Sequence, residues 1–115
     1  LTSTSEQRMC EELLINATME QTVVQYAKNA ATAGLEGIVC SPLEAGLVKA
    51  ACGNAFQTIT PGIRFADGDI ADQVRVTTPA RAREIGSDYI VVGRPITQAS
   101  DPVGAYIRCI NEFVG

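Results

Sequence analysis

Short apolar runs alternate with longer amphipathic stretches along most of the chain. Residues 37–40 and 88–92 carry apolar side chains on both faces, as expected of parallel strands that are covered by helices. Residues 56–60 form the strand predicted between them, and residues 1–3 have the character of the end of a further strand. The pattern therefore predicts four strands, each followed by a helical stretch.

Helix start signals separate these strands. Ser41 is a predicted N-cap, Pro42 occupies the first helical turn, and Glu44 completes a capping box. Thr78 and Asp101, each followed by a proline, begin two more helices in a similar way. The predicted helices cover residues 6–14, 19–33, 42–52 and 78–85, and the stretch from residue 101 to the carboxyl terminus.

The order of these elements predicts the fold class. Strands that alternate with helices form a parallel sheet in an α/β fold. Four such units make half of a TIM (β/α)8 barrel. We therefore expect residues 1–115 to form half of a single TIM-barrel domain. A flavodoxin-like sheet is the alternative, although that fold normally needs a fifth strand.

Charge and composition limit the classes of function. The net charge of −4 argues against the basic face that nucleic acid or anionic lipid requires. The chain contains no histidine, which excludes histidine general bases, Ser-His-Asp triads and most zinc sites. No apolar run approaches the roughly 20 residues of a membrane span. We expect no metal, no nucleic acid and no membrane among the partners.

The cysteines indicate the compartment. None of the four belongs to a C-x-x-C pair, and each lies within an apolar stretch. We interpret them as free buried thiols in a reducing cytoplasm, rather than as disulfides or metal ligands. They are Cys10, Cys40, Cys52 and Cys109.

Glycine and arginine follow two of the predicted strands. Gly62 and Arg64 come after the strand at 56–60, and Gly93 and Arg94 come directly after the last strand. Ligands of parallel α/β folds bind at the carboxyl ends of the strands, and TIM barrels commonly bind phosphate after their last two strands. A glycine lets the backbone approach a ligand, and the arginine fork suits phosphate oxygens. The sequence therefore predicts a phosphate site, although either pair alone could be a turn with a solvated arginine.

A long acidic segment at residues 65–72 lies between the two pairs. We expect it to be a mobile loop that closes over the ligand; a solvated loop without a role is the alternative. Gln73 follows it, and its amide can both donate and accept hydrogen bonds. The remaining basic residues that we considered are expected to face solvent: Lys28, Lys49, Arg75, Arg81, Arg83 and Arg108.

The residues around both pairs resemble orotidine 5′-monophosphate decarboxylase of the bacterial type. The first run is Thr60-Pro61-Gly62-Ile63-Arg64 with Gln73 after it, and the second extends from residue 88 to residue 97. Residues 1–3 resemble the end of that family's fifth strand, and residues 37–41 resemble its sixth. The resemblance covers the whole chain, and it implies the C-terminal half of the barrel, about strands 5–8.

This resemblance implies an enzyme that is normally a homodimer. Members convert orotidine 5′-monophosphate to uridine 5′-monophosphate (UMP) and CO₂ in pyrimidine biosynthesis, without a metal or an organic cofactor. By position, Arg64 and Arg94 would hold the 5′-phosphate with the backbone N–H groups of Gly93 and Arg94. Gln73 would reach the phosphate and the pyrimidine, and Thr2 with Ser3 would contact the pyrimidine edge. The implied substrate-binding residues are Thr2, Ser3, Pro61, Gly62, Arg64, Gln73, Gly93 and Arg94.

The family's catalytic residues have no match here. They form an alternating Asp and Lys network on the first strands, and the chain contains no Asp-x-Lys-x-x-Asp pattern. We therefore expect no catalytic residue in this chain, an N-terminal half-barrel as its partner, and no activity from the chain alone. Two alternatives remain: a self-associating half-barrel that binds a phosphorylated ligand without catalysis, and a related sugar-phosphate decarboxylase or isomerase.

Overall fold

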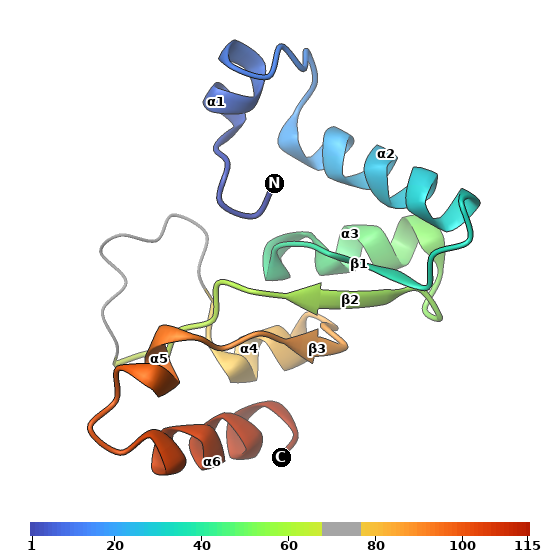
Figure 1. Ribbon diagram of the computed structural model, residues 1–115. Coiled ribbons are helices and arrows are strands. Elements are labelled where there is room, and N and C mark those ends of the chain that lie inside the picture. Colours follow the sequence, from blue (N-terminus) through green and yellow to red (C-terminus); the bar gives the residue numbers. More distant parts are fainter. Residues whose placement is uncertain (68–76) are drawn as a thin grey trace.

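The computed structural model describes residues 1–67 and 77–115 and contains a parallel sheet in the order β1-β2-β3 (Figure 1). Its strands are β1 (Gly37–Val39), β2 (Gln57–Thr60) and β3 (Tyr89–Ile90). The described helices are α1 (Glu6–Glu11), α2 (Met19–Thr32), α3 (Pro42–Cys52), α4 (Pro79–Glu84), α5 (Arg94–Thr97) and α6 (Pro102–Phe113). The predicted alternation of helices with parallel strands is confirmed.

The helix start signals act as the sequence predicts. The Ser41 hydroxyl accepts a hydrogen bond from the Leu43 N–H at 3.2 Å, and Glu44 accepts one from the Ser41 N–H at 3.2 Å. Thr78 and Asp101 cap α4 and α6 with their side chains, and each is followed by a proline in the first turn. These caps satisfy N–H groups that have no partner within a helix, so they fix where each helix begins.

The two faces of the sheet differ in their cover. Helices α3 and α4 lie on one face, behind the sheet in Figure 1, and Thr58 and Thr60 of β2 are fully buried. Val39, Ile59 and Tyr89 are aligned across the three strands, and the outer two are 60% and 52% exposed. Because neighbouring positions of a strand point to opposite faces, this row marks the uncovered face of the sheet.

The main apolar core lies on the helix side of β1 and β2. It joins α1, α2 and α3 through buried side chains that include Met9, Val23, Ala27 and Val48. The apolar stripe predicted for residues 19–33 supplies the contribution of α2, and Phe56 closes the core just before β2.

Several predictions about the strands were wrong. Residues 1–3 form a turn, with the Thr4 N–H donating to the Leu1 carbonyl at 3.2 Å, and not the end of a strand. Strand β3 covers only Tyr89 and Ile90, whereas residues 88–92 were predicted. The strands predicted to be covered on both faces expose Val39 and Tyr89, because these side chains lie on the uncovered face, opposite to α3 and α4 (Figure 1).

Three further predictions are corrected. The first helix ends at Glu11, and Leu14, within the range predicted to be helical, has a φ of 58°, which a helix does not allow. Cys10 is exposed rather than buried, although all four cysteines are free as expected. Residues after Gly93 form the short helix α5, where the sequence predicted only a strand-end loop.

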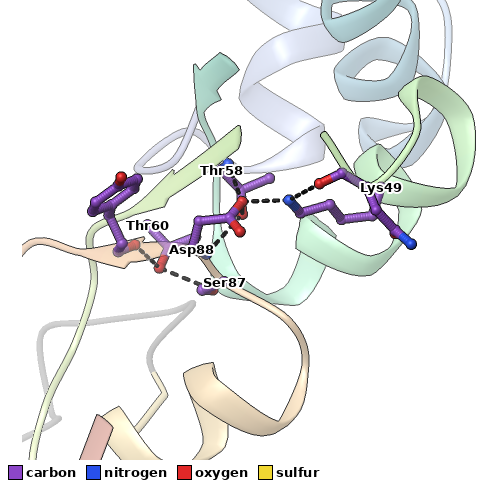
Figure 2. A network of polar contacts seen from close by, with 7 residues as sticks. Lys49, Thr58, Thr60, Ser87 and Asp88 are labelled. Atoms are coloured by element: carbon purple, nitrogen blue, oxygen red, sulfur yellow. Dashed lines mark hydrogen bonds and ion pairs between the residues drawn. The ribbon is translucent and has the colours of Figure 1, made fainter. Parts of the chain in front are cut away.

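A polar network joins α3 to the amino end of β3, as Figure 2 shows. The Asp88 carboxylate forms an ion pair with Lys49 and accepts a hydrogen bond from the Thr58 N–H at 2.8 Å. Lys49 also donates to the Asn54 carbonyl at 3.0 Å, and its side chain is only 13% exposed. The prediction that Lys49 faces solvent was therefore wrong.

The same network continues to the buried side of β2. Thr60 Oγ1 lies 3.1 Å from Ser87 Oγ and 3.2 Å from the Tyr89 carbonyl oxygen. Hydrogen bonds of this kind allow a strand to bury two threonines without leaving their hydroxyls unsatisfied. The Lys49–Asp88 ion pair lies at the amino end of β3, where side chains of such folds serve stability rather than catalysis.

Replacing Asp88 with asparagine should therefore destabilise the fold by about 1–3 kcal/mol, because Lys49 and the Thr58 N–H lose a charged acceptor. Burial alone raises the pKa of Asp88, but the hydrogen bonds from Lys49 and Thr58 outweigh it and lower the pKa below its usual value. A lowered folded-state pKa stabilises the fold above the unfolded pKa of about 4, and this contribution is lost as the pH falls through the folded pKa. Urea denaturation should show a large difference between the native chain and Asp88→Asn near neutral pH and a smaller one below about pH 4. An equal difference at both pH values would contradict the role of the charge.

Candidate functional site

The segments that follow β2 and β3 leave the sheet from the same end. Ile59 pairs with Tyr89 and Thr60 with Ile90 in parallel register, and the Val91 N–H extends the pairing by donating to the Thr60 carbonyl at 3.0 Å. The two glycine–arginine pairs therefore start from neighbouring strands at the carboxyl end of the sheet. This end is opposite to the Lys49–Asp88 network.

The backbone around Arg64 is held in place by Thr77. The Arg64 N–H donates to the Thr77 carbonyl at 2.9 Å, and the Thr77 N–H donates to the Gly62 carbonyl at 3.2 Å. Ile63, between them, is almost fully buried and bridges to Thr77. Gly62 has a φ of 79°, in the left-handed region that favours glycine, so it provides the turn that leads β2 into this bridge.

The second segment forms the start of α5. Gly93 is its N-cap, and the Gly93 carbonyl accepts hydrogen bonds from the N–H groups of Ile96 at 2.9 Å and Thr97 at 3.1 Å. A methyl group added to Gly93 would meet no other atom within 4 Å, so the space beside this backbone is open. Arg94 is exposed, and Pro95 fixes the first turn behind it. A ligand could therefore approach the backbone here closely.

The remaining predicted site residues are not all brought together. Gln73 lies outside the described residues, as does most of the acidic segment. Pro61 is half-buried next to Gly62. Thr2, which is half-buried, lines a cavity of about 350 Å³ beside β1, and the described residues that line this cavity include neither Arg64 nor Arg94. Ser3 is exposed in the adjoining turn.

This arrangement suits an anion with several oxygens. Two guanidinium groups on neighbouring segments can each form paired, charge-assisted hydrogen bonds, and glycine backbone leaves room for the ligand. Local positive charge of this kind is compatible with a chain of net charge −4. Within residues 1–67 and 77–115, no group of three or more Cys, Asp or Glu side chains is placed to hold a metal ion.

Sequence reasoning missed one contact near this site. Arg108, which was predicted to face solvent, forms an ion pair with Asp67 at 2.9 Å and lies over the Phe65 ring, 4.0 Å from its centroid. Its partners are about forty positions away along the chain, so no local periodicity links them. The only local signal is the spacing of Arg108 and Glu112 by one helical turn.

No helix in the part of the chain that the structure describes is long and apolar enough to cross a membrane.

The sequence is similar to those of known proteins along the whole chain. A model of the "Orotidine 5′-phosphate decarboxylase / HUMPS family" matches residues 1–109. The chain is 57% identical over 115 residues to an orotidine 5′-phosphate decarboxylase of Bacillus mycoides and 54% identical to one of Bacillus caldolyticus. All of this chain is covered in both cases, but only 48% and 47% of the relatives. The chain therefore spans about half the length of the curated relatives it matches.

Solved structures agree with this similarity. The crystal structure of orotidine 5′-phosphate decarboxylase from Lactobacillus acidophilus matches with a TM-score of 0.83 at 41% identity, over 100% of this chain and 46% of that one. The enzyme from Pyrococcus horikoshii, at 21% identity and a TM-score of 0.65 over 84% of this chain and 44% of that one, supports the fold alone. With its parallel sheet and flanking helices, this chain is half of a TIM barrel, and it belongs to the orotidine 5′-phosphate decarboxylase / HUMPS family.

Proposed function

We propose that residues 1–115 are the C-terminal half of a single TIM-barrel domain of an orotidine 5′-monophosphate decarboxylase. The whole barrel would convert orotidine 5′-monophosphate to UMP and CO₂ in pyrimidine biosynthesis, in the cytoplasm. The observation that carries this proposal is the pair of glycine–arginine segments that leave neighbouring parallel strands at the same end of the sheet. Membership of the family, with 54% sequence identity to one of its decarboxylases, supports the choice of reaction.

In this proposal the chain binds the substrate and does not break its bond. Arg64 and Arg94, with the backbone N–H groups of Gly93 and Arg94, would hold the 5′-phosphate. Gln73 would reach both the phosphate and the pyrimidine, and Thr2 with Ser3 would contact the pyrimidine edge. Loss of CO₂ leaves a poorly stabilised carbanion, so binding energy from a remote phosphate is needed to hold the reacting carbon in place. The Asp and Lys residues that act on that carbon would come from the N-terminal half.

The uncovered surfaces of the sheet support such a partner half. Val39 and Tyr89 are exposed on the uncovered face, which would become the barrel interior. A second apolar surface lies between β3 and α6, where a cavity of about 380 Å³ is lined by residues that include Ile90, Tyr106 and Ile110. A strand of the N-terminal half that pairs with β3 would cover this cavity and form hydrogen bonds with the backbone groups at the edge of β3. The homodimer is proposed from the family resemblance alone.

A joined protein tests the proposal directly. In it, the amino-terminal half of the Bacillus caldolyticus relative is placed before Leu1 of this chain in one polypeptide. We expect the joined protein to decarboxylate orotidine 5′-monophosphate and the 115-residue chain alone to show no turnover. The amino-terminal half of the relative, expressed alone, is the control. Turnover by the chain alone, or a well-folded joined protein that neither binds UMP nor turns over substrate, would contradict the proposal.

The second candidate is a half-barrel that self-associates and binds a phosphorylated ligand without catalysis. It is favoured by the same exposed row on the uncovered face, because a large apolar surface seldom remains open to water. Light scattering on the chain alone separates the candidates. A stable oligomer that binds UMP, together with an inactive joined protein, would favour this second function.

A further inference from the structure

Arg108 connects helix α6 to the segment that follows Arg64. Its guanidinium lies over the Phe65 ring with its carbon 4.0 Å from the ring centroid, and it forms an ion pair with Asp67 Oδ1 at 2.9 Å. On the other side, Arg108 Nε donates to Glu112 Oε2 at 2.7 Å. One side chain therefore makes three contacts, two of them with residues 65–67.

These contacts fit the chemistry of arginine. Its planar fork can donate to two carboxylates while its face lies on an aromatic ring, which a lysine ammonium cannot do at the same time. Glu112, one turn further along α6, orients the fork from within the helix. Hydrogen bonding to Arg108 lowers the pKa of Asp67, because it favours the charged form of the carboxylate. The arrangement is more specific than a single surface ion pair.

The position of these contacts relates them to the phosphate site. Phe65 directly follows Arg64 and is only 9% exposed. Arg64 is already joined through its backbone to Thr77. Arg108 therefore adds a contact to the chain on the carboxyl side of Arg64, beyond the bridge to Thr77, by holding Phe65 and Asp67 against α6.

We propose that Arg108 is a positioning residue for phosphate binding, which acts by holding residues 65–67 on α6 and thereby fixing the backbone of Arg64 at the carboxyl end of β2. This inference rests on the proposed function, because it assigns Arg64 to the phosphate. Arg108 itself need not touch the ligand. Its removal should weaken binding of a phosphorylated ligand and leave binding of the same ligand without phosphate unchanged.

The test compares UMP with uridine in the joined protein. Arg108→Gln should raise the dissociation constant for UMP by about threefold to tenfold, the range expected for an exposed pair combined with a cation–π contact. The constant for uridine should not change. Arg108→Lys, which keeps the charge but not the fork, should recover only part of the loss. Arg81→Gln is the matched control, because Arg81 forms an exposed helical pair with Glu84 at 3.0 Å, whereas it is Arg108 that contacts Phe65 and Asp67.

A second variant and a second measurement keep the test independent of folding and of the ligand. Asp67→Asn removes the partner without altering α6, and the double variant with Arg108→Gln should bind UMP no worse than Arg108→Gln alone. Hydrogen exchange of the Arg64 N–H should become faster in both single variants and stay unchanged in Arg81→Gln. Unchanged UMP binding in Arg108→Gln, while the unsubstituted joined protein prefers UMP to uridine, would overturn this inference and leave the proposed function intact. No preference for UMP in the unsubstituted protein would overturn the proposed function, and unchanged exchange at Arg64 would then overturn the inference as well.

Discussion

Replacing Arg94 with alanine in the joined protein is expected to weaken UMP binding by roughly 10-fold to 150-fold, which corresponds to about 1.5–3 kcal/mol for a charge-assisted hydrogen-bonded contact. Arg64→Ala should have an effect of the same size, because both guanidiniums are assigned to one phosphate. Uridine, which has no phosphate, should bind equally well to the variants and to the unsubstituted protein. Isothermal titration with both ligands measures the difference.

The control for these variants is Arg81→Ala, which removes an exposed arginine of α4 whose side chain pairs with Glu84 on the same helix. It should bind UMP like the unsubstituted protein. Equal losses of UMP and uridine affinity in Arg64→Ala or Arg94→Ala would mean that the arginines stabilise the fold or bind the pyrimidine, and do not bind the phosphate. Parallel far-UV circular dichroism spectra exclude misfolding as the cause.

Gly37→Ala is expected to be the most destabilising single substitution in the sheet. A Cβ atom at Gly37 would lie 2.3 Å from the Gln57 carbonyl oxygen and 2.9 Å from the carbonyl carbon, and both belong to backbone. Because the two residues are paired across β1 and β2, the strands would have to separate to admit a methyl group. We expect a loss of about 2–4 kcal/mol in the free energy of unfolding, measured by urea denaturation.

Gly46→Ala is the matched control for this prediction. Gly46 lies in α3, and a Cβ atom there would meet nothing within 4 Å. The same chemical change should therefore stabilise the chain by about 0.5–1 kcal/mol, because alanine has a higher helix propensity than glycine. If Gly37→Ala lowered the free energy of unfolding by less than a substitution at an exposed position of the sheet, this result would contradict the close approach of β1 and β2.

The sequence predicted those features that depend on neighbouring residues. Ser41, Pro42 and Glu44 determine the start of α3 within one turn, and the structure confirms each of their roles. The same holds for the caps at Thr78 and Asp101. The order of strands and helices follows from these local signals, and with it the half-barrel fold.

The features that were missed depend on residues far apart in the chain. Lys49 looks like a solvated helical lysine until Asp88, thirty-nine positions later, is placed beside it by the pairing of β2 with β3. Arg108 meets Phe65 and Asp67 only because α6 packs near the carboxyl end of β2. The exposure of Val39 and Tyr89 likewise depends on which elements cover that face of the sheet, and an apolar pattern cannot indicate that.

The candidate site combines both kinds of information. The two glycine–arginine pairs were visible in the sequence because each follows a strand directly, and the parallel register of β2 and β3 brings the segments to one end of the sheet. The roles of Thr2, Ser3, Pro61 and Gln73 in binding stay predictions.

The most direct test of the phosphate assignment is the amide NMR spectrum of the joined protein during titration with UMP and, separately, with uridine. We expect the amide signals of Gly62, Arg64, Gly93 and Arg94 to shift with UMP and to remain in place with uridine. Shifts of equal size with both ligands would contradict the phosphate assignment, as would UMP-induced shifts confined to residues at the opposite end of the sheet, around Lys49 and Asp88.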